Sequence, residues 1–413
     1  MNKNYRLHYL FIFIFLSFIV FGIVNDGLMN VVYGLGRIIK EPDILITDYF
    51  EVGGIGATFV NAGLIGIINT SIFLILKTKA NGAITAAIWT SVGFAMFGKN
   101  IVNIWPIMFG VWLYSKYKRE SFLNYALIAI FSTNLSPTLI QFRGLEIVHS
   151  YFSMILGILI SIFIGFIFPP LAAYCLKFHQ GYCLYNTGLT AGFIATILVS
   201  NVRAFGGDIP KRLLWYNNRD VGVEFILLFT FLIMILYSIK IGGKIKVDEL
   251  KELNKTSGKL VTDFTVLYGE DVALLNMGIM GIVYMAFTLL ISNLNGPIIG
   301  GLFTIVGFSA LGKHLNNTLP VVLGAAISSY LNVHSLTSPA VLLAMLFCTT
   351  LAPISGEFGP IWGMVAGFLH VSMALSVGYL HAGLNLYNNG FAGGLVAMFL
   401  IPLISAYRER RNV

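Results

Sequence analysis

One phrase occurs twice in this chain, and it constrains the fold more than any other feature. HQGYCLYNTGLTAG occupies residues 179–192, and HAGLNLYNNGFAGG occupies residues 381–394. Further matches precede each copy in the same order, among them GFAMFGKNIVNIWP from Gly93 and GFSALGKHLNNTLP from Gly307. Collinear matches over such a length indicate an internal duplication. The chain is therefore expected to fold as two related units.

The duplication predicts two repeats, at residues 1–212 and 213–413, each with about seven apolar segments. In the first repeat the segments lie near residues 8–24, 55–76, 81–98, 101–115, 122–140, 148–176 and 183–200. In the second repeat they lie near residues 221–240, 270–292, 296–311, 316–333, 338–355, 358–380 and 384–404. The polar stretch 241–269 is interpreted as a cytoplasmic linker with room for a short helix. The first repeat carries extra residues around its sixth segment.

Composition places these segments in a membrane. Apolar residues make up 57% of the chain and charged residues 11%, whereas soluble domains carry about 25% charge. Several apolar runs approach the roughly 20 residues that a helix needs to span a bilayer. We therefore predict an all-α integral membrane protein. The run at residues 9–24 lacks a following small-residue cleavage site, so we interpret it as a retained first span.

The loop charges favour an inverted arrangement of the two repeats. An odd number of segments in each repeat would turn the second repeat over relative to the first, as in many transporters. The basic loop KTKA at residues 77–80 corresponds to uncharged ISNLN at 291–295, and SKYKRE at 115–120 corresponds to SYLNVH at 329–334. Short cytoplasmic loops are rich in Lys and Arg. We expect a bacterial plasma-membrane protein with both termini in the cytoplasm.

The motif G-F-x-x-x-G-K-x-x-x-N-x-x-P is the first candidate for function. It interrupts two short apolar segments, as in re-entrant or broken helices that line a cavity. It places Lys99 with Asn103 and Lys313 with Asn317 at related positions. A charge at membrane depth is costly and usually functional, so the lysines are predicted to attract an anion. The alternative is that both lysines lie in ordinary interfacial loops and extend toward water.

The opening phrase supplies the second candidate. Its glycines allow close helix packing, and Asn186 and Asn388 are predicted to cap the starts of helices. Such helix starts carry partial positive charge that suits an anion or a carbonyl oxygen. His179 and His381 precede the two asparagines at the same spacing and join the predicted site. The alternative is that the glycines only pack helices together and the histidines lie at the membrane interface.

Other residues give weaker signals. Glu357 lies in PISGEFGP and is a candidate carboxylate for proton or sodium coupling, although the first repeat has no acid at that place. The three cysteines lack metal-ligand spacing, and no hydrolase or nucleotide-binding motif is present. We expect no cofactor, no metal, no enzymatic activity and no nucleic-acid partner. The positive net charge of +8 is attributed to loops facing anionic lipid.

The motifs GKNIVNIWP with GKHLNNTLP, and LYNTG with LYNNG, resemble a family of bacterial multi-spanning membrane proteins of unknown function. NAGLIG and GLNLYNNGFAGGLVA also resemble phrases of urea transporters. That second resemblance would imply a pore for a small polar solute between two halves. It departs from the urea-transporter pattern in having seven segments per half instead of five, and lysines in the interrupted hairpins.

The sequence thus predicts a transporter or channel for a small polar or anionic solute, with its site between the repeats. The alternatives are a membrane-embedded enzyme and a sensor or scaffold that transports nothing. An enzyme would concentrate acids, bases or metal ligands in one repeat. The expected partners are the solute, the lipid bilayer and, as an option, further copies of the chain.

Overall fold

The computed structural model describes residues 3–143, 150–210 and 212–411, and every regular element among them is a helix. Eight helical stretches in the described residues are long and apolar enough to cross a membrane. They lie at Arg6–Asp26, Ile55–Ile75, Phe152–Phe178, Val221–Gly242, Glu270–Ile291, Pro339–Phe358, Pro360–Val377 and Asn388–Arg410. The chain is therefore an all-α, multi-pass membrane protein, as predicted.

The helices follow one another in the same order in both halves of the chain. The first half holds α1 (Arg6–Asp26), α2 (Leu28–Lys40), α3 (Tyr49–Gly53), α4 (Ile55–Ile75), α5 (Gly82–Phe94), α6 (Trp105–Tyr117), α7 (Leu123–Ser132), η2 (Thr133–Leu135), α8 (Thr138–Arg143), α9 (Ser150–Phe178) and α10 (Asn186–Ala204). The second half holds α11 (Val221–Gly242), α12 (Val247–Leu253), α13 (Phe264–Leu267), α14 (Glu270–Ile291), α15 (Gly296–Phe308), α16 (Leu315–Leu331), α17 (Pro339–Phe347), η3 (Cys348–Leu351), α18 (Ala352–Phe358), α19 (Pro360–Val377) and α20 (Asn388–Arg411).

Fewer helices are long enough to span than the fourteen apolar segments counted in the sequence. The segments at 81–98 and 296–311 form α5 and α15, which are only 13 residues each. At 1.5 Å per residue such a helix is about 20 Å long, less than the roughly 30 Å of a bilayer core. Both helices begin at an asparagine whose side chain accepts a backbone N–H, Asn81 from Ile84 and Asn295 from Ile298. Both end in a turn that leads to a lysine.

Glycines set the closest helix contacts within each half. A Cβ added to Gly110 of α6 would lie 2.0 Å from the Ile162 carbonyl oxygen of α9. A Cβ added to Gly324 of α16 would lie 1.9 Å from the Met364 carbonyl oxygen of α19. Only glycine permits this approach, so α6 packs on α9 as α16 packs on α19.

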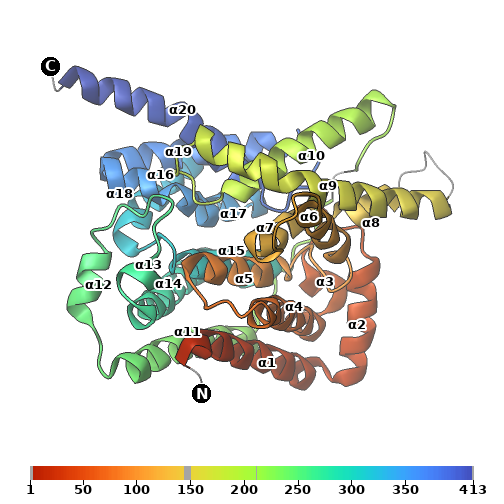
Figure 1. The fold of residues 1–413 in the computed structure, drawn as a ribbon, viewed down its shortest axis with the longest axis horizontal. Coiled ribbons are helices and arrows are strands. Elements are labelled where there is room, and N and C mark those ends of the chain that lie inside the picture. The colour runs from red at the N-terminus through yellow and green to blue at the C-terminus, as the bar shows by residue number, and fades with distance from the viewer. Residues whose placement is uncertain (1–2, 144–149, 211, 412–413) are drawn as a thin grey trace.

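The two halves meet along two helix pairs, α5 with α15 and α10 with α20. Gly188 and Gly390 face each other at the start of the second pair, because a Cβ on Gly188 would lie 2.7 Å from the Gly390 Cα. In Figure 1 the short helix α2 lies at one end of the long horizontal helices, and α12 lies at the opposite end.

Each half also holds the start of the other half's short helix, α5 or α15, through an aspartate. Asp48 caps α3 by accepting the Phe50 N–H at 3.0 Å, and it accepts the Gly296 N–H of α15 at 3.1 Å. Asp263 caps α13 by accepting the Thr265 N–H at 2.9 Å, and it accepts the Gly82 N–H of α5 at 2.9 Å. These aspartates join the start of α5 and of α15 to the opposite half.

The extra residues of the first repeat lie partly in α9, which has 29 residues where α19 has 18. The polar linker 241–269 contains the two short helices α12 and α13, so the expected short helix is present. The first apolar run forms α1, which packs against α4.

Candidate functional site

Lys99 and Lys313 lie in the turns that follow α5 and α15, and both side chains are fully buried. One asparagine on the preceding long helix fixes each turn. The Asn61 amide nitrogen donates to the carbonyl oxygens of Ala95 at 2.7 Å and Lys99 at 2.9 Å. The Asn276 amide nitrogen donates to the carbonyl oxygens of Ser309 and Lys313, both at 2.8 Å. The two lysines are therefore presented by the same backbone frame.

Asn103 and Asn317 close the other side of each turn. The Asn103 side chain accepts the Asn100 N–H at 2.9 Å and donates to the Gly98 carbonyl at 3.2 Å. The Asn317 side chain accepts the His314 N–H at 3.0 Å and donates to the Gly312 carbonyl at 2.9 Å. Both amides thus hold the lysine turns in place, and direct contact with a solute stays a prediction.

The ammonium groups meet only uncharged partners. Lys99 Nζ donates to Ser91 Oγ at 3.2 Å and to Asn134 Oδ1 at 3.4 Å. Lys313 Nζ donates to the Tyr185 hydroxyl and, at 2.8 Å, to Thr349 Oγ1. Among the described residues, no ion pair joins either lysine to a carboxylate.

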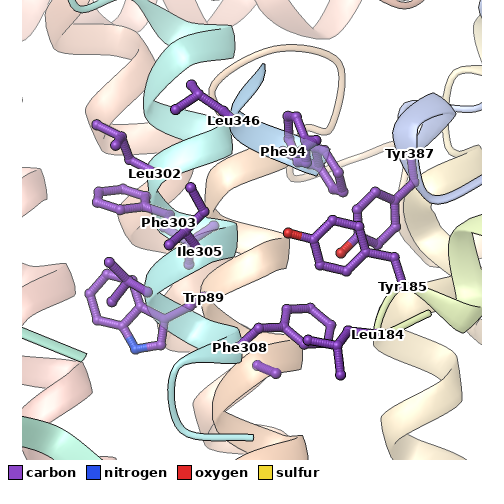
Figure 2. Close-up of a cluster of buried hydrophobic side chains, with 14 of the residues drawn as sticks. Trp89, Phe94, Leu184, Tyr185, Leu302, Phe303, Ile305, Phe308, Leu346 and Tyr387 are labelled. Atoms are coloured by element: carbon purple, nitrogen blue, oxygen red, sulfur yellow. The ribbon is translucent and has the colours of Figure 1, made fainter. Parts of the chain in front are cut away.

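Aromatic rings surround both lysines. Lys313 Nζ lies 4.3 Å from the centre of the Tyr185 ring and 5.4 Å from that of Phe308, and Lys99 Nζ lies 5.7 Å from that of Phe94. The rings of Tyr185 and Tyr387 are 4.6 Å apart, beside Phe94 and Phe308 (Figure 2). Faces of such rings attract cations. The tyrosines of the repeated Leu-Tyr-Asn phrase therefore lie between the two lysine turns.

The phrase also crosses between the halves. The Leu184 N–H of the first half donates to the Thr350 carbonyl of η3 at 2.9 Å. The Leu386 N–H of the second half donates to the Asn134 carbonyl of η2 at 3.2 Å. Tyr185 reaches Lys313 because its own turn is bonded to the opposite half. Through the repeated phrase, each half is thus bonded to the short 3-10 helix of the other half that carries a lysine partner, Thr349 or Asn134.

The histidines and asparagines of the phrase bond to one another. His179 Nε2 lies 2.9 Å from Asn186 Oδ1, and the Asn186 amide nitrogen donates to the Ala172 carbonyl at 3.0 Å. The same distances in the second half are 2.8 Å from His381 to Asn388 and 3.0 Å from Asn388 to the Ala374 carbonyl.

The prediction that Asn186 caps its own helix is therefore wrong. Tyr185 occupies the cap position of α10 without a side-chain bond, since the Asn186 amide is engaged by α9. A role of these four side chains in binding a solute stays a prediction.

Glu357 lies apart from the lysines, exposed near the end of α18. Sequence analysis missed Tyr185, Thr349, Ser91 and Asn134 as lysine partners. The repetition of Leu-Tyr-Asn marked the tyrosines, but nothing in the sequence pairs a tyrosine of one half with a lysine of the other.

Three buried carboxylates away from the lysine turns have partners of their own. Glu270 pairs with Arg6 at 2.5 Å and with Lys79 at 3.1 Å. The Asp271 carboxylate accepts a hydrogen bond from Lys246 that raises the pKa of this lysine. Burial raises the pKa of Asp48 to about 7, against the effect of its backbone hydrogen bonds. These acidic groups therefore serve in ion pairs and as a helix cap, whereas the buried Asp43 carboxylate accepts a hydrogen bond from the Asn103 side chain at 3.2 Å.

The sequence profile of one protein family matches this chain twice, at residues 28–204 and 243–406. That family is described as "Protein of unknown function (DUF1576)". The chain belongs to the DUF1576 family. The first match runs from the start of α2 to the end of α10, and the second runs from just before α12 into α20. The expected membership of an uncharacterised family is confirmed, and the likeness to urea transporters stays a prediction. Neither the curated proteins nor the solved structures contain a match to this chain.

Proposed function

We propose that this protein is a transporter or channel for a small anionic solute that passes between the two halves of the chain. The observation that carries the proposal is the pair of fully buried lysines, Lys99 and Lys313, whose hydrogen-bond partners within the described residues are all neutral oxygens. A buried charge without a counter-charge costs several kcal/mol. An anion from solution would supply that counter-charge at the point where the halves meet.

The helix arrangement supports a pathway at this point. α5 and α15 carry their C-terminal ends into the lysine turns, and the partial negative charge of these ends favours the ammonium groups. Discontinuous helices that meet between inverted repeats form the binding sites of many transporters. The location of α2 and α12 at opposite ends of the long helices in Figure 1 supports such an inversion, and so does the charge contrast between 77–80 and 291–295.

In this proposal the lysines attract the solute, and the hydroxyls of Tyr185 and Thr349 replace part of its hydration. Asn61, Asn276 and their partners keep the lysine turns rigid, which preorganises the site. Both chain termini lie in the cytoplasm of a bacterial cell. Because the sequence carries no nucleotide-binding motif, transport would be passive or coupled to an ion gradient.

The test is flux into proteoliposomes of purified protein, with formate, chloride, sulfate and neutral urea as probes. We expect at least one anion to enter faster than into empty vesicles, and Lys99→Met and Lys313→Met each to reduce that flux. Entry of urea alone, unaffected by both variants, would refute an anion pathway. No flux of any probe through well-folded protein would favour the sensor or scaffold alternative.

A further inference from the structure

A cavity of about 260 Å³ lies between α5, α7, α9 and α10 of the first half and the end of α15. Its lining is mostly apolar and includes Phe131, Ala173, Leu184 and Phe308. The polar residues that line it are Asn186 and Thr187, at the first turn of α10. The cavity also borders residues 260–261 of the linker, where Val261 is exposed. It therefore lies between the linker surface and the interior of the protein.

The inner wall of this cavity is also the wall of the Lys313 site. Phe308 lines the cavity, and its ring centre is 5.4 Å from Lys313 Nζ. Leu184 lines it as well and directly precedes Tyr185, whose hydroxyl accepts a hydrogen bond from Lys313. The Phe308 ring therefore lies between the cavity and the buried ammonium group, and a ligand in the cavity could reach Lys313 only if this ring turned aside.

The equivalent positions of the second half are packed differently. Leu375 and Gly378, which correspond to Ala173 and Leu176, line a separate pocket of about 590 Å³. Leu127 of the cavity is half-buried, whereas its counterpart Leu343 is 3% exposed. Asn186 is half-buried, whereas its counterpart Asn388 is 5% exposed. The two halves thus differ at these two positions, where the first half leaves space beside the start of its last helix and the second half fills it.

We propose that this cavity binds the apolar body of a small organic anion, a short-chain monocarboxylate, whose negative group turns toward Lys313. The inference rests on the anion pathway proposed above and specifies its solute class. An apolar pocket with few polar groups, and a buried lysine directly behind its Phe308 wall, matches a ligand with an apolar body and a single charge. Sulfate or another fully hydrated anion would gain nothing from the apolar lining.

The experiment measures binding of a homologous series from formate to hexanoate to the full-length protein in detergent, by thermal stability at fixed ionic strength. Each buried methylene should tighten binding about fourfold until the cavity is full. The neutral amides of the same chain lengths are the matched control, and we expect them to bind far more weakly because they lack the charge.

Two variants test the two ends of the site separately. Ala173→Leu introduces the residue that the second half carries at the equivalent position, Leu375, and should remove the gain with chain length while formate binding stays as before. Ala173→Ser keeps the cavity open and should behave as the unaltered protein. Lys313→Met should weaken binding of the whole series about 100-fold.

The outcomes separate this inference from the proposed function. Anion binding that depends on Lys313 but shows no gain with chain length would overturn the cavity assignment and leave the anion pathway standing. A second result would be that amides bind as tightly as carboxylates, with the same affinities in Lys313→Met. That result would identify the cavity as a site for lipid or detergent chains and would also overturn the cavity assignment. Absence of any Lys313-dependent anion binding would contradict both proposals.

Discussion

The Lys99 and Lys313 environments share one backbone frame but differ in where their partners come from. Ser91 and Asn134, the partners of Lys99, both belong to the first half, as Lys99 does. Lys313 belongs to the second half, yet one of its partners is the Tyr185 hydroxyl of the first half. Movement between the halves would therefore separate Lys313 from one of its hydrogen-bond partners, whereas both hydrogen-bond partners of Lys99 belong to its own half.

The side chains diverged while the frame was kept. Ser91 of α5 is replaced by Ile305 at the equivalent position of α15, so Lys313 has no hydroxyl there and turns to Tyr185 and Thr349. The comparison teaches that the two halves present a buried lysine on the same backbone frame but surround it with different hydrogen-bond partners. Lys313, which adjoins the cavity, is expected to carry the greater share of binding.

The largest effect should come from Lys313→Met. We expect it to weaken anion binding about 100-fold, since truncating one partner of a buried charged pair costs 2–5 kcal/mol, and Lys99→Met to weaken it less. Without anion, both variants should melt at or above the temperature of the unaltered protein, because methionine replaces an unpaired buried cation. Binding measured by thermal stability against formate and butyrate decides this. Equal losses in both variants would contradict the specialisation of Lys313.

A second effect concerns the helix contacts that the halves share. Gly110→Ala and Gly324→Ala should each destabilise the fold by about 3 kcal/mol or more, since the added Cβ would overlap a backbone oxygen of the facing helix. Denaturant unfolding in detergent measures the loss. Gly36→Ala is the control, because a Cβ there meets nothing within 4 Å. If only one of the two variants lost unfolding free energy, the α6–α9 contact and the α16–α19 contact would not be equally close in solution.

A third and smaller effect tests the shared frame itself. Asn61→Ala and Asn276→Ala should each cost about 2–3 kcal/mol, because both leave buried carbonyl oxygens without a donor. The two losses in unfolding free energy should agree closely. A much smaller loss for Asn276→Ala would mean that the linker supports the Lys313 turn independently.

The smallest effect is the pH dependence of Asp48. Its pKa in the folded protein is about 7, above the value of about 3.9 for an unfolded chain. The folded state then binds more protons than the unfolded state between these values, so stability falls as pH rises through this window. We expect a loss of roughly 1–3 kcal/mol between pH 5 and pH 8.

Asp48→Asn should flatten this part of the stability profile, and Asp263→Asn, its counterpart at the start of α5, is the matched control. Melting temperature recorded across the pH range makes the comparison. An unchanged slope in Asp48→Asn would assign the pH dependence to another group.

The sequence determined the helix class, the membrane environment and the regular recurrence of elements. Long apolar runs with few charges admit only helices across a bilayer, because every backbone N–H and C=O must be paired within its own segment. The repeated spacing of Gly-Lys and Asn in GKNIVN and GKHLNN likewise predicted related lysine turns. Such features are local, so a pattern of a dozen residues contains them.

Tertiary structure decided which segments are too short to span and which groups meet. The sequence left open whether the apolar stretch 81–98 crosses the membrane or folds back. In the structure its helix ends at Phe94, and the backbone that follows is bonded to Asn61. The meeting of Lys313 with Tyr185, 128 residues apart, follows from the bonding of Leu184 to the opposite half. Contacts of this kind depend on how two complete units dock. The way two units pack together depends on many weak contacts spread over a whole surface, so it cannot be predicted from a short stretch of sequence.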